Sequence, residues 1–343
     1  MERYIAVDNV CAWPNLTQLP NGDIVAAIFN QPAHGRWEGD VDCWASSDGG
    51  RLWSYRGTAA RHDPGNNRMN VAAGLCPDGS LLVIASGWDN RPSPPKTPEE
   101  KAEVERKNVF AINLPSLIYR STDGGADWTV IGQFDQHDLD GPNKKYWIPF
   151  SDIITLADGR LAFAAYSANR KGVRILFSED NGKTWSIPVS IVDSDQYHNE
   201  TAIISLGGTT ILAAVRCEEK RILELYRSED SGKTWSYQIP LTLRGQMPGH
   251  ILKLQDGALL LTYGIRNKPF CGIGARISID GGNSWGEPVF LVNFENVADC
   301  GYPSSVQTDD GTIVTAYYCK NIPTHNRYHM GVTCWRPEEF STR

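Results

Sequence analysis

Several features are scarce or missing in this sequence, and each one excludes a class of protein. No apolar run is long enough to span a bilayer, so no membrane partner is expected. The 8 cysteines form no C-x-x-C pair, which argues against a zinc site, and no cofactor is expected. A formal net charge of −7 offers no broad basic surface for nucleic acid.

Two further absences bear on the compartment. Residues 1–4, MERY, carry no signal-peptide pattern, and the scattered cysteines form no recognisable disulfide framework. We therefore expect a reducing, cytoplasmic compartment, with a secreted chain that has lost its signal as the alternative. The oligomeric state is left open.

The most repetitive stretch is an eight-residue box that ends in tryptophan. SEDNGKTW at residues 178–185 returns as SEDSGKTW at 228–235, and looser copies occupy residues 46–53, 121–128 and 278–285. In each copy Asp can bond the amides of its own turn, Gly supplies a positive φ, and Trp folds back as an apolar plug. The five boxes predict hairpin turns that count structural modules.

A second repeat interleaves with the boxes and completes the modules. Turns of Asp-Gly type lie between apolar strands at residues 21–22, 78–79, 158–159, 207–208, 256–257 and 310–311. Each turn but the last is followed by a box, which predicts an all-β, six-bladed β-propeller built as a single domain over residues 1–343. Residues 4–7 are expected to complete the last blade. Residues 90–107 are expected to form an insertion in the second blade, with a short helix at 98–107.

Blade geometry predicts which residues share the mouth of the ring. The first strand of a hairpin begins on the rim where its second strand ends, so both positions collect there. The strand starts bring Trp13, Arg68, Asn70, Tyr146, Trp147, His198, Glu200, His250 and Tyr302 to this rim, and the strand ends bring the segment 34–42, Trp88, Arg170, Arg216, Arg266 and Lys320.

These motifs resemble the Asp boxes of sialidases and related β-propellers. The segment from Glu200 to Arg216 is similar to the sialidase pattern of a Glu before the fourth-blade hairpin and an Arg after it. The sequence GYPSSV at residues 301–306 resembles the family's Tyr-Ser-Ser-Leu strand. The resemblance implies that Tyr302 is the nucleophile, Glu200 its base, and Arg216 a ligand of the substrate carboxylate.

The remaining roles follow from the same resemblance and leave alternatives open. Arg266 fits the family's third arginine, with Arg276 as the alternative. His250 and Trp13 are expected to contact substrate because the strand geometry places them at the rim. The resemblance implies a general acid on the loop before the first box. Asp40 has the best spacing and Glu38 is close, while Asp42 is expected in the following strand, and the sequence does not decide among the three.

One departure from the family concerns the first arginine of its carboxylate clamp. Ala12 stands where sialidases have that arginine. Arg68, at a similar offset in the next blade, is the expected replacement, and Arg36 on the acid loop is the second candidate.

The chemistry accounts for a tyrosine nucleophile. A sialic-acid-like sugar carries a carboxylate on its anomeric carbon, which would repel a carboxylate nucleophile but not a neutral phenol. We therefore expect a retaining exo-glycoside hydrolase of sialidase type that acts on a terminal acidic sugar of a small glycan. The alternatives are an exo-arabinanase-like propeller with paired carboxylates on a neutral sugar, and a non-catalytic carbohydrate-binding propeller.

Overall fold

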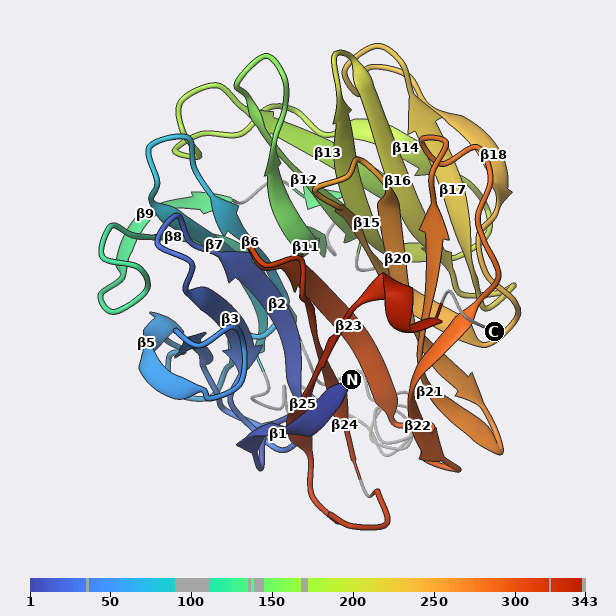
Figure 1. The fold of residues 1–343 in the computed structure, drawn as a ribbon. Helices are drawn as coiled ribbons and strands as arrows, with labels where there is room; N and C mark the ends of the chain where they lie inside the picture. Colours follow the sequence, from blue (N-terminus) through green and yellow to red (C-terminus); the bar gives the residue numbers. More distant parts are fainter. Residues whose placement is uncertain are drawn as a thin grey trace, which may run out of the picture.

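The computed structural model describes residues 1–34, 37–89, 112–134, 137–138, 145–167, 172–320 and 322–340 (Figure 1). Over these residues the chain forms strands and one short 3-10 helix, η1 (Pro337–Phe340). The insertion expected at residues 90–107 lies outside the described residues. None of the described helices is long and apolar enough to cross a membrane.

The strands form six antiparallel units of four, which confirms the predicted blades. Blade 1 comprises β2 (Ala12–Gln18), β3 (Ile24–Phe29), β4 (Val41–Ser46) and β5 (Ser54–Ala60). Blade 2 comprises β6 (Val71–Leu75), β7 (Leu81–Asp89), β8 (Ile112–Ser121) and β9 (Thr129–Phe134). Blade 3 comprises β11 (Lys145–Thr155), β12 (Leu161–Ser167), β13 (Gly172–Ser178) and β14 (Val189–Asp193), with β10 (His137–Asp138) paired to β11.

The second half of the chain repeats the pattern. Blade 4 comprises β15 (His198–Gly207), β16 (Thr210–Cys217), β17 (Ile222–Ser228) and β18 (Ser236–Pro240). Blade 5 comprises β19 (Gln246–Lys253), β20 (Leu259–Asn267), β21 (Phe270–Ser278) and β22 (Val289–Glu295). Blade 6 comprises β23 (Cys300–Gln307), β24 (Ile313–Cys319), β25 (His329–Trp335) and the N-terminal strand β1 (Glu2–Asp8).

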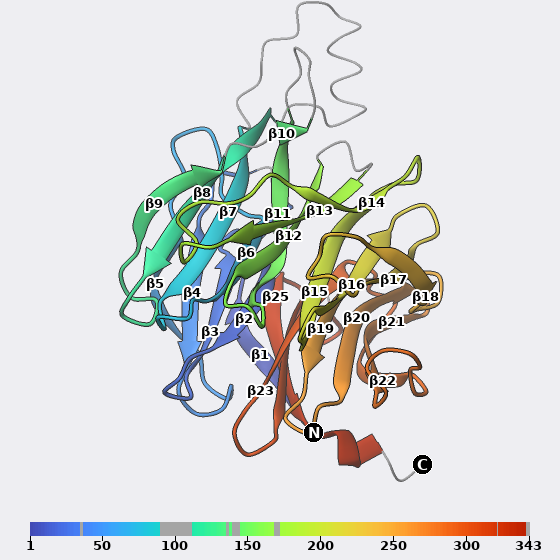
Figure 2. The same ribbon diagram turned by 90° about the horizontal axis from the view of Figure 1, so that it is seen from above.

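The first strand of each blade lies innermost, and these strands contact one another around a ring. The contacts run from β2 through β6, β11, β15, β19 and β23 back to β2. β6 and β11 are even joined as parallel neighbours at Ser151 and Asp152. Strand β1 pairs with β25, so the two ends of the chain share one sheet, as the sequence predicts (Figures 1 and 2). This pairing covers the edge that β25 would otherwise expose.

The Asp boxes form the turns between the third and fourth strands of blades 1 to 5, away from the central cavity described below. In the box at 228–235, Asp230 accepts hydrogen bonds from Ser228 Oγ at 2.8 Å and from the Thr234 amide at 2.9 Å. Trp235 Nε1 donates to the Gly232 carbonyl at 3.1 Å. A Cβ at Gly232 would lie 2.7 Å from Phe177 of the preceding blade. The boxes therefore complete their own turns and also pack against the neighbouring blade.

Candidate active site

A cavity of 320 Å³ lies where the six innermost strands meet, within the size range of small-molecule sites. Its lining residues come from all six blades. They are Trp13, Pro14, Asn15, His34, Met69, Asn70, Val71, Trp88, Phe150, Ser151, Tyr166, Glu200, Gly249, His250, Tyr302, Pro303 and Ser304. Trp13, Glu200, His250 and Tyr302 thus lie at the mouth that the strand geometry predicts.

Bulges in the inner strands aim consecutive residues at this cavity. A regular strand turns successive side chains to opposite faces, so it cannot present three residues in a row to one space. Tyr302, Pro303 and Ser304 all line the cavity because the register of β23 against β24 shifts between Gly301 and Ser304. Tyr302 has a φ of 49° there, in a backbone region that non-glycine residues rarely adopt.

The central pair of the site is Tyr302 and Glu200. The Tyr302 hydroxyl donates to Glu200 Oε1 at 2.6 Å across blades 6 and 4. Arg216 on β16 donates through Nη1 to Glu200 Oε2 and, at 3.3 Å, to the Tyr302 oxygen. The arrangement provides a phenol, an acceptor for its proton, and a cation beside both.

The environment of Tyr302 keeps its phenol protonated at rest. Burial and the nearby Glu200 carboxylate raise the pKa of Tyr302 above its ordinary value, although Arg216 and Arg266 act in the opposite direction. The guanidinium carbon of Arg266 lies 5.5 Å from the centre of the Tyr302 ring. Any negative charge that develops on the phenol oxygen is therefore met by two arginines.

Each nitrogen of the Arg216 guanidinium has a protein partner. Its Nε donates to Glu218 Oε2 at 2.7 Å, and its Nη2 lies 2.6 Å from the same oxygen. Although burial alone lowers it, the charges of Glu200, Tyr302 and Glu218 raise the pKa of Arg216 above its ordinary value. Arg216 therefore stays charged, and all three of its nitrogens are engaged.

The two candidates for the third arginine are separated clearly. Arg266 donates through Nε to the Cys300 carbonyl at 3.0 Å and stands next to the Tyr302 ring. Arg276 donates to carbonyls in and near the box of blade 5, among them Gly286 and Trp285. The geometry favours Arg266 as the cation of the site.

The prediction that Arg68 completes a clamp at the mouth is wrong. Arg68 is buried but does not line the cavity, and its Nη1 donates to the Pro115 carbonyl at 2.7 Å and the Ala85 carbonyl at 3.4 Å. Its side chain is thus turned into the sheet of blade 2, where burial lowers the pKa of the guanidinium. The other candidate, Arg36, lies outside the described residues, as does Arg170.

The carboxylates of the acid loop are not among the residues that line the cavity. Asp40 Oδ1 accepts from the backbone and from Nδ1 of His62, both at 2.7 Å, and Glu38 lies 3.4 Å from His62 Nε2. Asp42 falls within β4, as expected, where it accepts from Asn30 and Thr58. Asp40 and Glu38 stay predictions for the general acid.

Other expected rim residues point away from the cavity. Trp147 packs in the core, under the guanidinium of Arg174, and His198 lies in a buried cluster. The expected place of Tyr146 and Trp147 at the mouth is taken by Phe150 and Ser151. Strand β11 begins earlier than the sequence pattern indicates, and its register shifts after Phe150, so the residues at the mouth lie further along the chain.

A cluster of hydrogen-bonded polar side chains, which the sequence did not reveal, lies where the inner strands meet. His250 on β19 bonds Asp152 on β11 at 2.8 Å, and Asn15 on β2 donates to Asp152 at 3.3 Å and to the Ser151 carbonyl at 2.6 Å. The Ser305 amide donates to His250 Nδ1 at 3.3 Å. Because that nitrogen accepts, the proton of a neutral His250 is on Nε2, directed at Asp152.

Aromatic side chains form one wall of the cavity, and the sequence pattern predicted only part of this wall. Trp13 lies 5.7 Å from Phe29, 5.2 Å from His34 and 6.2 Å from Tyr302 between ring centres. Behind it, Asp299 accepts from His34 at 2.9 Å and from the hydroxyls of Tyr318 and Tyr328 at 2.9 and 2.5 Å. No local sequence signal marks Asp299, since its partners come from distant segments.

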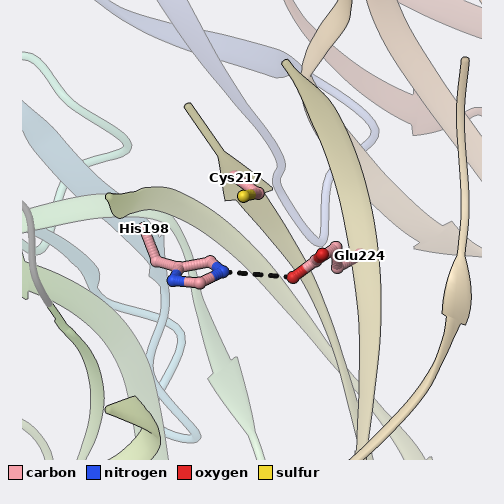
Figure 3. A group of neighbouring side chains, drawn as sticks. All are labelled: His198, Cys217 and Glu224. Carbon is pink, nitrogen blue, oxygen red and sulfur yellow. Dashed lines mark hydrogen bonds and ion pairs between the residues drawn. The ribbon is translucent and has the colours of Figure 1, made fainter. Parts of the chain in front are cut away.

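Among the described residues, one set of side chains has metal-type ligand atoms close together. Figure 3 shows His198 directed at Glu224, with Cys217 nearby, and their ligand atoms lie within 4.8 Å of one another. These donors suit zinc. However, Glu224 already bonds His198 at 3.1 Å and Lys220 at 2.7 Å. We interpret the set as a buried ion-pair network that supports β15 and β16 behind the site.

The comparisons with known proteins agree with this architecture. Residues 101–315 match the family model described as a BNR repeat-like domain. No curated protein matches the sequence. Among solved structures, a protein of unknown function from Dyadobacter fermentans is 23% identical with a TM-score of 0.77, and the match covers 97% of each chain.

Two sialidases show the same fold at lower identity. The NanB sialidase of Streptococcus pneumoniae is 13% identical with a TM-score of 0.70, over 98% of this chain and 70% of that one. The intramolecular trans-sialidase of Ruminococcus gnavus is 13% identical with a TM-score of 0.69, over 99% of this chain and 98% of that one. These structures match the six-bladed β-propeller predicted from the repeats.

Proposed function

This chain belongs to the family of BNR repeat-like domains, and on that premise we propose that it is a retaining exo-glycoside hydrolase of sialidase type. Tyr302 is the nucleophile and Glu200 is its base. The observation that carries the proposal is the 2.6 Å hydrogen bond from the Tyr302 hydroxyl to Glu200 in the wall of the cavity. The 320 Å³ volume of the cavity favours one terminal sugar.

In the first step the Tyr302 oxygen attacks the anomeric carbon while its proton passes to Glu200 Oε1. The glycosidic C–O bond breaks, and the leaving oxygen takes a proton from the general acid, for which Asp40 and Glu38 are the candidates. Because the phenol is protonated at rest, transfer to Glu200 accompanies attack instead of preceding it. Arg216 and Arg266 stabilise the charge that develops on the phenol oxygen.

In the second step water attacks the anomeric carbon of the glycosyl-tyrosine. The bond to the Tyr302 oxygen breaks, the phenol recovers its proton from Glu200, and the loop carboxylate that acted as acid accepts a proton from the water. Two displacements at one carbon retain the anomeric configuration.

The test is the Tyr302→Phe variant with an aryl glycoside that the wild-type protein hydrolyses. We expect kcat to fall by roughly two to four orders of magnitude with little change in binding. Tyr317→Phe is the matched control, because Tyr317 is buried in the same blade but packs in the core away from the cavity. Proton NMR of the first sugar released should show retention, and inversion would exclude the tyrosyl intermediate.

A further inference from the structure

The charge of the cavity wall sets what kind of sugar can enter it. Among the described lining residues, Glu200 is the one with a full formal charge at neutral pH. The two lining histidines are each bonded to a carboxylate, His34 to Asp299 and His250 to Asp152. The described wall therefore offers no unpaired cation to an anionic substrate.

The arginines near the site do not fill that gap. Arg216 uses Nε and Nη2 on Glu218 and Nη1 on Glu200 and Tyr302. Arg266 donates Nε to a backbone carbonyl, and its guanidinium lies beside the Tyr302 ring instead of in the lining. Ala12, at the position of the family's first arginine, is fully buried. Among the described residues, a substrate carboxylate would thus meet the ring of Tyr302 and the charge of Glu200, with the Nη groups of Arg266, outside the lining, in place of a three-arginine clamp.

The same wall has polar residues suited to sugar hydroxyl groups and aromatic residues suited to the apolar face of a sugar ring. Asn15, Asn70 and Ser304 are neutral polar residues of the lining. Asp152, held by His250 and Asn15, places a fixed carboxylate acceptor behind them, which would also repel an anion. Trp13, Trp88 and Phe150 provide aromatic surface.

We infer that the terminal sugar bound in this cavity is uncharged, and that the group Asn15–Asp152–His250 contributes to this selectivity. The inference rests on the proposed glycoside hydrolysis and replaces the acidic sugar expected from the sequence. Glu200 bonded to Tyr302 and Asp152 fixed by His250 disfavour a carboxylate, while Glu200, which lines the cavity, can accept a hydrogen bond from a sugar hydroxyl.

The experiment compares substrate pairs in which one member carries a carboxylate that the other lacks. The pairs are aryl glucosides with glucuronides, aryl galactosides with galacturonides, and an aryl sialoside methyl ester with its free acid. We expect kcat/KM for the neutral member to exceed that for the acidic member by about tenfold or more in every pair that is hydrolysed. Greater activity on the acidic members, abolished by Glu200→Gln, would overturn the inference and leave the proposed hydrolase standing.

Two variants separate selectivity from general damage. Asp152→Asn removes one of the repelling charges, so the neutral-to-acidic ratio of kcat/KM should fall several-fold, whatever the loss of overall rate. Asp193→Asn is the control, because Asp193 is an exposed carboxylate of the same blade, paired with Arg174 away from the cavity. If Asp152→Asn leaves the ratio unchanged, Asp152 does not contribute to the selectivity.

If no pair is hydrolysed, the proposed function is refuted. Binding measurements then test the inference about charge on their own. Isothermal titration with the same intact pairs then measures charge preference directly. Tighter binding of neutral members supports an uncharged ligand. Tighter binding of acidic members, or no binding of any member, overturns the inference.

Discussion

Replacing Asp299 with Asn should destabilise the aromatic wall of the cavity in a pH-dependent way. The carboxylate accepts hydrogen bonds from His34, Tyr318 and Tyr328, and the variant loses the charge that these donors stabilise. Burial alone would raise its pKa, but the bonds from His34 and Tyr328 outweigh burial and lower the pKa of Asp299 to about 2. The shift gives both a magnitude and a pH window.

A change from 3.8 to about 2 corresponds to roughly 2 kcal/mol at about 1.4 kcal/mol per unit. The side chain is 39% exposed, so solvent screening reduces the expected loss to about 1 kcal/mol. Because the folded pKa lies below the unfolded value, this stability is fully present above about pH 4. It disappears as the pH falls through the folded pKa near 2.

The assay is urea unfolding followed by the fluorescence of the 11 tryptophans, from pH 7 down to the lowest pH at which the protein stays folded. The difference in unfolding free energy between the wild type and Asp299→Asn should be about 1 kcal/mol at pH 7 and should shrink below pH 4. Asp309→Asn, an exposed carboxylate in the turn after β23, controls for losing one charge. A difference that stays constant with pH, or no difference at pH 7, would refute the reasoning.

Three further changes test other parts of the structure. Trp185→Ala should cost about 3 kcal/mol, because its ring meets Phe163 edge-on at 4.6 Å, and an unchanged melting temperature would contradict the packing. Arg68→Ala should lower the melting temperature and reduce activity equally on charged and neutral substrates, because Arg68 bonds the Pro115 carbonyl. A loss of activity confined to charged substrates would instead show that Arg68 binds the substrate carboxylate. Glu218→Gln should lower kcat roughly tenfold with KM little changed, because Arg216 loses the carboxylate that positions it, and an unchanged kcat would show that Glu200 alone fixes Arg216.

The blades could be predicted because their signals are local. A box such as residues 178–185 and a turn such as Asp256-Gly257 each fold within a few residues, and their alternation counts the modules. The pairing of Glu200 with Tyr302 spans 102 residues and has no local signal. It was accessible only because both segments resemble motifs of one family.

What the sequence could not provide are contacts across the ring and shifts in register. Asp152 and His250 are 98 residues apart and meet only because blades 3 and 5 face the same axis. Arg68 has the offset of a mouth residue, yet its side chain turns toward the carbonyl of Pro115. Counting positions from a turn assumes a regular strand, and the inner strands are irregular where they reach the cavity.

That irregularity places backbone strain at the chemical centre of the ring. Trp13, Ser151 and Tyr302 line the cavity with φ of 46°, 66° and 49°, at a cost of about 1–3 kcal/mol each. Such strain persists only where the surrounding structure fixes it, and here the strained residues lie on innermost strands that contact one another around the ring. A relaxed β23 would alternate its side chains and turn either Tyr302 or Pro303 out of the cavity. The bulge therefore places the phenol of Tyr302 against Glu200.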